Sequence, residues 1–112
     1  MALLYHLAMS DARVEQFRKM AEQFPDNAMA QFSLGKALLE ARRYAEAVGA
    51  LESAVRLEPA YAAALVSLGD AHAGAGQTAQ AREVLTRARD TALAQSHASL
   101  AEEIDERLSG LD

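Results

Sequence analysis

The residues best suited to bind a metal or transfer a proton near neutral pH are the three histidines, His6, His72 and His97. No two of them have the i, i+4 spacing that places metal ligands on one helical face, so we predict no metal site. We expect His72 at a packing position of a helix and His97 in a turn. The chain has no cysteine, which excludes disulfides, thiolate ligands and thiol catalysis.

Other patterns that support catalysis or cofactor binding are missing. No serine, histidine and aspartate show the arrangement of a catalytic triad. The segment Gly74-Ala75-Gly76 lacks the lysine and the preceding strand of a phosphate-binding loop. We therefore predict that the protein is not an enzyme, has no catalytic residues and binds no cofactor.

Charge and hydropathy exclude two further classes of partner. The net charge is −5, whereas binding to nucleic acid phosphates needs a basic stripe. No run approaches the roughly 20 apolar residues of a membrane-spanning helix. Residues 1–8 are apolar but lack a basic start and a cleavage site, so we do not interpret them as a signal peptide. We expect no nucleic acid or membrane partner and, without a targeting signal, a cytoplasmic location.

The strongest pattern is a stretch that the sequence states twice, first from Phe32 to Pro59 and again from Val66. Identical residues recur 34 positions apart, without a gap, at Leu34 and Leu68, Gly35 and Gly69, Ala37 and Ala71, Ala47 and Ala81, Leu51 and Leu85, Ala54 and Ala88. A fixed period of about this length is typical of stacked helix–turn–helix repeats. The abundance of alanine and leucine, with only two prolines, also predicts an all-α fold.

The apolar spacing divides this chain of one-domain length into repeat units. We predict helices at 28–41 and 44–57 in a first repeat (28–61), and at 62–73 and 78–92 in a second repeat (62–95). Gly35 and Gly69 lie inside helices, where glycine costs about 1 kcal/mol relative to alanine. We therefore expect a close helix crossing at both glycines. The same crossings explain the small residues Ala47, Ala54, Ala81 and Ala88.

A further helix is expected at 10–25, before the first repeat. Ser10 is a suitable N-cap, and Asp11 beside it favours the positive end of the helix dipole. Pro25 precedes Pro59 by 34 residues, so this helix is in register with the second helix of a repeat.

Residues 1–8 leave two interpretations open. Leu3, Leu4 and Leu7 share one helical face. They form either the tail of a truncated first helix of a repeat or a frayed end, with the ordered chain starting at Met9.

The period fails after the second repeat, because Leu93 occupies the position that corresponds to Pro59. We predict a polar break at 95–97 and a last helix at 98–109. One continuous helix through Ser96 is the alternative.

The last helix belongs to a segment, 96–112, that we interpret as a cap of the stack. Its apolar face is followed by an acidic surface made of Glu102, Glu103, Asp105 and Glu106. A polar outer surface is what a terminal unit of a repeat array needs. The carboxylates form either a solvated face or a docking surface for a basic partner, and Glu103 is spaced to pair with Arg107.

These repeated residues resemble the tetratricopeptide repeat (TPR) family. The first copy carries Leu34, Gly35, Leu38, Ala47, Leu51, Ala54 and Pro59, and the second carries Leu65, Leu68, Gly69, His72, Ala81, Leu85 and Ala88. Gln31, His72 and Leu93 depart from the family pattern. The resemblance implies a single TPR domain over 1–112, an α-α superhelix of about six helices.

The resemblance also implies a concave groove, lined by the first helices of the repeats, that binds a peptide. By register, its residues are Met29, Phe32, Ser33, Lys36, Leu39 and Glu40, followed by Ala63, Val66, Ser67, Asp70, Ala73 and Gly74. This groove is mostly apolar. It is either open or covered by the chain's own ends or by another copy.

Lys36 and Asp70 occupy equivalent positions on adjacent helices. They either pair with each other as a solvated ion pair or orient a partner. Some TPR domains grip a peptide's terminal carboxylate with lysine and asparagine, but Lys36 is the only basic residue in this groove, so we predict no such clamp.

Two functions fit these expectations. The first is a protein–protein interaction module that binds a peptide or helix in the groove. The second is a self-assembling structural protein, a homodimer or swapped array, in which the groove is covered. The identity of the partner is not encoded in the fold.

Overall fold

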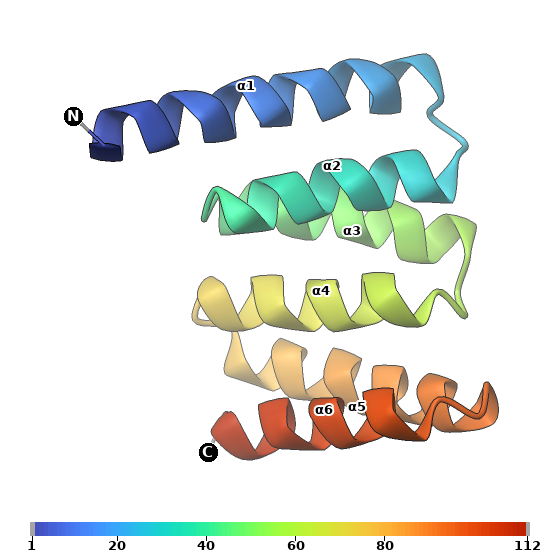
Figure 1. Ribbon diagram of the computed structural model, residues 1–112. Coiled ribbons are helices and arrows are strands. Elements are labelled where there is room, and N and C mark those ends of the chain that lie inside the picture. Colours follow the sequence, from blue (N-terminus) through green and yellow to red (C-terminus); the bar gives the residue numbers. More distant parts are fainter. Residues whose placement is uncertain (1, 112) are drawn as a thin grey trace.

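The computed structural model describes residues 2–111, with the side chains of all of these except residues 5–7, so His6 and Leu7 lie outside the described side chains. All elements in this range are helices, which confirms the all-α prediction (Figure 1). They are α1 (Ala2–Gln23), α2 (Ala28–Glu40), α3 (Tyr44–Leu57), α4 (Ala62–Gly74), α5 (Thr78–Ala94) and α6 (Ala98–Gly110).

The helices stack in chain order as antiparallel neighbours. The pairs α2/α3 and α4/α5 are the two repeats, α1 packs on α2, and α6 packs on α5. In Figure 1, α2, α4 and α6 lie on the near side of the stack, with α3 and α5 behind them. This arrangement is the α-α superhelix expected from the repeat pattern.

The helix crossings confirm why glycine recurs inside the first helix of each repeat. A Cβ atom at Gly35 would lie 2.5 Å from Cγ of Leu51, and one at Gly69 would lie 2.5 Å from Cγ of Leu85. The four alanines expected at these crossings, Ala47, Ala54, Ala81 and Ala88, are fully buried. Small residues therefore set the distance between paired helices.

Three of the turns share one conformation. Arg42, Gly76 and Ser96 each have a positive φ, and the next residue donates its N–H to a carbonyl five residues back, as in His97 to Ala92 at 2.8 Å. This left-handed closure ends a helix without proline. It ends α5 at Ala94, so the alternative of one continuous helix through Ser96 is wrong.

The first helix differs from its prediction. α1 begins at Ala2, and Ser10 lies in its interior rather than at its N-cap. Both interpretations of residues 1–8 are therefore wrong for residues 2–8, which continue α1. The physical reason is that no proline or glycine interrupts this segment, and an interior serine costs only about 0.5 kcal/mol relative to alanine.

One apolar core runs through the whole stack. Its largest fully buried side chains are Leu38, Leu51, Leu65, Leu85, Ile104 and Val14. Val14 comes from α1 and Ile104 from α6, so both terminal helices share this core. No polar or charged side chain among the described residues is buried.

Candidate protein-binding surfaces

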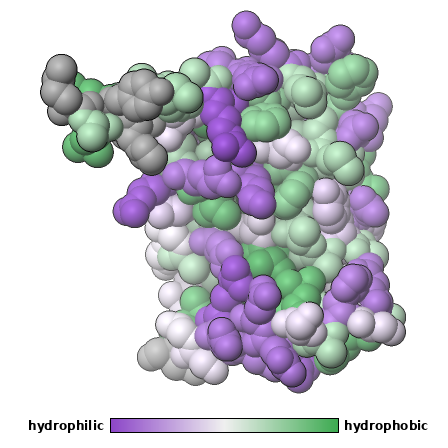
Figure 2. Space-filling model, viewed as in Figure 1, coloured by the Kyte–Doolittle hydropathy of each residue, from purple (hydrophilic) through white to green (hydrophobic). Residues whose placement is uncertain are grey.

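The face formed by α2, α4 and α6 holds the residues predicted to line the groove. Each of these helices has 13 residues, so equivalent positions can be counted from the first residue of each. Asn27 starts α2 by accepting a hydrogen bond from the Ala30 N–H at 2.9 Å. Figure 2 shows apolar surface in the middle of this face, between clusters of hydrophilic side chains.

An aromatic pair connects α2 with the start of α4. The ring of Phe32 lies 5.1 Å from that of Tyr61, tilted by 44°, and both are half-buried. Nζ of Lys36 stands 5.9 Å from the centre of the Phe32 ring. Burial, together with the charge of Glu58, raises the pKa of Tyr61. Sequence reasoning missed Tyr61, because it precedes α4 and the repeat register was applied only within helices.

Asp70 lies on α4 and pairs with α6 rather than with Lys36. Nε of Arg107 donates to both carboxylate oxygens of Asp70, at 3.1 and 3.2 Å. Burial raises the pKa of Asp70, and the guanidinium of Arg107 partly offsets this effect. The expected Lys36–Asp70 pair is therefore wrong, and Arg107 is directed to α4 instead of to Glu103. The side chain of Arg107 reaches from α6 to α4, which a pattern within one helix does not reveal.

The remaining predicted residues of α4 differ in exposure. Ala63 and Ala73 are exposed and Ser67 is half-buried. Val66 is only 8% exposed and belongs to the core, so it offers little surface to a partner. Gly74 lies under the ring of Tyr44, which a Cβ atom there would overlap.

The predicted residues of α2 separate into two groups. Phe32 and Lys36 stack as described above, and Leu39 is half-buried against the core. Met29 and Ser33 instead turn toward α1, where they line a hollow of about 280 Å³ with Met20, Phe24, Asn27 and Ala30.

A second hollow lies along the middle of α1, with a volume of about 590 Å³. It is lined by Met9, Ser10, Ala12, Arg13, Gln16, Phe17 and Glu40. NH1 of Arg13 is 3.9 Å from a carboxylate oxygen of Glu40, and its guanidinium carbon lies 5.6 Å from the centre of the Phe17 ring. The sequence-based groove contained Glu40 but none of the α1 residues.

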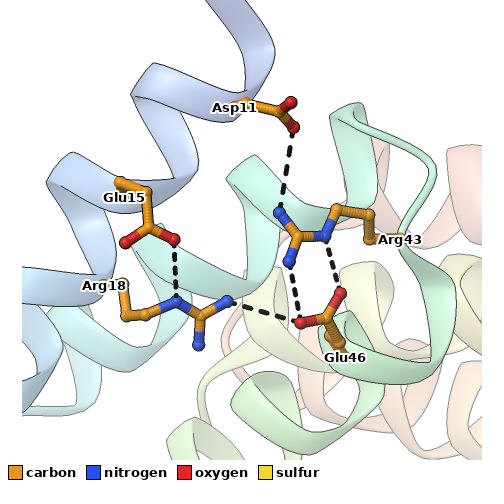
Figure 3. A network of polar contacts seen from close by, with 5 residues as sticks. All are labelled: Asp11, Glu15, Arg18, Arg43 and Glu46. Carbon is orange, nitrogen blue, oxygen red and sulfur yellow. Dashed lines mark hydrogen bonds and ion pairs between the residues drawn. The ribbon is translucent and has the colours of Figure 1, made fainter. Parts of the chain in front are cut away.

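A polar network holds α1 to α3 and to the turn before it (Figure 3). Glu46 accepts hydrogen bonds from Arg43 at 2.6 and 2.9 Å and from Arg18 at 3.4 Å. Arg18 also bonds Glu15, and Arg43 approaches Asp11 at 3.9 Å. The Arg43 hydrogen bond is the main cause of a lowered pKa at Glu46. The network therefore orients α1 on the stack.

His72 and His97 occupy structural positions. His72 is half-buried, and its Nδ1 lies 2.7 Å from Oε1 of Gln77, which fits a helix boundary. His97 stands in the turn before α6, as predicted. Among the residues that the structure describes, no group of three or more His, Cys, Asp and Glu side chains is arranged to hold a metal ion. None of the helices in the described part of the chain has the length and apolar content that crossing a bilayer requires.

Known proteins share this sequence pattern and this fold. A model of the tetratricopeptide repeat family matches residues 10–56 and 32–98. The TPR repeat-containing protein PA0015 of Pseudomonas aeruginosa is 35% identical over 79 residues, which covers 70% of this chain and 75% of that protein.

Two solved structures show the same fold at lower identity. The TPR2B domain of yeast Sti1, in a complex with pHsp70, superposes with a TM-score of 0.86 and 21% identity, over 96% of this chain and 86% of that one. PcrH, in complex with the chaperone binding region of PopD, gives 0.85 and 18%, over 96% and 81% of the two chains.

Proposed function

Because the chain belongs to the tetratricopeptide repeat family, we propose that it is a protein–protein interaction module that binds a peptide or helical segment of another protein. Two proteins of the same fold, yeast Sti1 and PcrH, have been solved with segments of protein partners, pHsp70 and PopD. That precedent supports the class of function. It does not name the partner of this chain. A catalytic role and a cofactor are not part of the proposal.

The proposed contact surface is the mostly apolar face of α2, α4 and α6. The observation that carries it is the aromatic pair of Phe32 and Tyr61, which is half-buried and lies between two first-position helices. Aromatic side chains present a large contact area at low entropic cost and are enriched at binding hot spots. Lys36 beside this pair supplies a charge that orients the segment.

The test compares variants of the full chain in affinity capture from the source organism, followed by titration of the captured partner. Phe32→Ala removes half of the aromatic pair, and Leu57→Ala on α3 is the matched control, since Leu57 is exposed outside this face. We expect Phe32→Ala to weaken binding at least about tenfold, which is about 1.4 kcal/mol. Equal binding by both variants would reject this surface.

Self-assembly into a homodimer or swapped array is the second candidate function. The observation in its favour is that Leu3 and Leu4 of α1 are both exposed. Exposed leucines on a projecting helix are a common feature of isologous helix contacts. Small-angle scattering over a concentration series tests this candidate. A dimer that dissociates in the Leu4→Glu variant would support self-assembly, and a monomer at every concentration would reject it.

A further inference from the structure

α1 has the position of a second helix of a repeat, but no first helix precedes it within residues 2–111. Phe17, Leu51 and Leu85 are spaced by 34 residues, and the latter two pack against the glycines of their paired helices. Within residues 2–111, no glycine of a paired first helix packs against Phe17 in this way. The place where that helix would lie is bounded by α1 and α2.

The surface at this place is apolar at one end and mixed at the other. Met20, Phe24 and Met29 are 45%, 51% and 66% exposed, and all three line the hollow at the C-terminal end of α1. The hollow along the middle of α1 adds the paired charges of Arg13 and Glu40.

One stripe of α1 joins the two hollows. Met9, Arg13, Gln16, Met20 and Phe24 follow one another at intervals of three or four residues, which places them on one side of the helix. One helix laid along this side of α1 would therefore reach both hollows, and we call the two hollows together the α1 trough.

We propose that the α1 trough binds one amphipathic helix of a partner protein, antiparallel to α1, in the position of the missing first helix. This site is separate from the Phe32–Tyr61 surface and does not depend on it. Helix-in-groove binding of this kind is read through apolar anchors on one helical face.

The chain's own first-position helices show what this occupant needs. The eighth residue of both α2 and α4 is glycine, where the paired helix inserts a leucine. The occupant therefore carries a small residue opposite Phe17. Its N-terminal half supplies large apolar side chains for the hollow of Met20 and Phe24, and its C-terminal half supplies polar groups for Arg13 and Glu40.

The α6 end of a second copy of this chain does not supply such a helix. Within the described residues, α6 is the first-position helix that has no second helix after it. Its eighth residue is Asp105, whose carboxylate accepts a hydrogen bond from Arg89 at 2.6 Å. A charged residue at the crossing position prevents the close approach that glycine permits, so α6 of a second copy does not fit the trough as a small-residue helix of a partner protein does.

The contact is exchangeable rather than permanent. Arg13 and Met20 stand where the second helices α3 and α5 have alanine, namely Ala47 and Ala54 in α3. These larger side chains keep an added helix farther away than within a repeat. Methionine is flexible and adapts to different partners, which suits a reversible contact.

The test uses a synthetic peptide with the sequence of residues 27–41, which carries its own N-cap and the Leu-Gly pair. A lactam between the side chains of Lys36 and Glu40, which are one helical turn apart and exposed in α2, keeps this short peptide helical. The peptide is titrated into the full chain with labelled methionine methyl groups. We expect saturable shifts at Met20 and Met29.

Matched variants decide whether the trough is the site. Met20→Glu is expected to weaken binding at least about tenfold, whereas Leu93→Glu, at a similarly exposed position of α5 (48%), changes it less than about twofold. A peptide with Gly35→Leu is expected not to bind, because its large residue meets Phe17. Thermal melting of both protein variants confirms that they fold.

Three outcomes would overturn the proposal. They are the absence of saturable shifts, equal weakening by Met20→Glu and Leu93→Glu, and a dimer in sedimentation velocity that Met20→Glu dissociates, which would make the occupant a second copy. Phe32→Ala separates the two surfaces, because it is expected to leave peptide binding intact. Loss of peptide binding in Phe32→Ala alone would assign the peptide to the α2–α4–α6 face.

Discussion

At one end of the stack α6 carries charged side chains on its outer side, whereas at the other end α1 leaves Met20 and Phe24 half exposed. α1 keeps the 34-residue register, α6 follows α4 at an offset of 36 residues, and both helices contribute a side chain to the core. They differ at the crossing position. α6 has Asp105 where the inner repeats have glycine, and α1 retains the large apolar Phe17.

This difference shows how residue type at the crossing position favours or opposes the addition of a further helix. A stack of identical units would expose an apolar helix face at each end, so terminal units need a change of residue type. Here the change is complete at α6, where a charge occupies the crossing. At α1 the change is partial. Arg13 and Met20 replace the alanines found at these positions in α3, but the apolar side of α1 that carries Met20 and Phe24 remains exposed.

The ion pairs that hold the two terminal helices also differ. Glu46, which binds the arginines at the α1 end, has a lowered pKa, mainly because of the Arg43 hydrogen bond. Asp70, which binds Arg107 of α6, has a raised pKa, mainly because of burial. The carboxylate charge is therefore favourable at the α1 end and unfavourable at the α6 end.

The largest expected effect comes from exchanging the crossing residues. Gly69→Asp places a charged side chain against Leu85, because a Cβ atom at position 69 would lie 2.5 Å from Cγ of Leu85. We expect a loss of at least about 3 kcal/mol in the free energy of unfolding. Asp105→Gly is expected to cost less than about 1 kcal/mol. Urea unfolding measures both, and similar losses would contradict the difference between the inner repeats and the cap.

Truncating one anchor at each end gives the next largest effect. Ile104 is fully buried in α6, so Ile104→Ala is expected to cost about 2–4 kcal/mol. Met20→Ala on α1 is expected to cost less than about 0.5 kcal/mol, since Met20 is half exposed. A large loss of stability in Met20→Ala would show that the trough is covered in solution.

The pH dependence of stability tests the two ion-pair sites. The pKa of Glu46 is lowered by folding, so its contribution is present above the unfolded value of 4.5 and is lost as the pH falls through the folded pKa. Glu46→Gln is therefore expected to destabilise the protein slightly at pH 7 and to match the wild type in acid. Because Glu46 is solvent-exposed, the effect is small.

The opposite sign is expected for Asp70. Its pKa is raised by folding above 3.8, so stability decreases as the pH rises through the window between the unfolded and folded pKa values. Asp70→Asn is expected to be at least as stable as the wild type at pH 7. Thermal melts from pH 3 to 7 test both variants, and a destabilised Asp70→Asn at pH 7 would contradict this assignment.

The smallest effect is expected at the turn before α6. Ser96 has φ 62°, a left-handed conformation that costs non-glycine residues about 1–2 kcal/mol. Ser96→Gly removes this strain but adds entropy to the unfolded chain, so we expect a gain of about 0.5 kcal/mol. Glu52→Gly, at an exposed position inside α3, is the control and is expected to destabilise.

The repeat pattern was sufficient to predict the helices, the crossings and the turns, because each of these depends on residues close in the sequence or 34 apart. Gly35 and Gly76 are examples, since one permits a crossing and the other a left-handed turn. The residues that line the proposed binding face were predicted less completely. Tyr61 precedes its helix, and the Asp70–Arg107 pair depends on how α6 is placed relative to α4, so neither follows from spacing alone.

The continuity of α1 was missed for a different reason. A serine followed by an acidic residue is a good capping signal, and nothing in the local sequence tells an interior Ser10 from a capping one. The consequence matters for function, because the extended α1 and the hollow beside it were absent from the expected groove.

The most direct test of the difference between the ends is to add a helix to each and measure the melting temperature. In one variant a copy of residues 28–43 replaces residues 1–9, so that a first-position helix and its turn precede Ser10. In the other, a copy of residues 75–94 follows α6. We predict that the first raises the melting temperature by at least about 4 °C, equivalent to about 1 kcal/mol, and that the second does not raise it. An unchanged first variant, or an equal rise in both, would contradict an open α1 end and a closed α6 end.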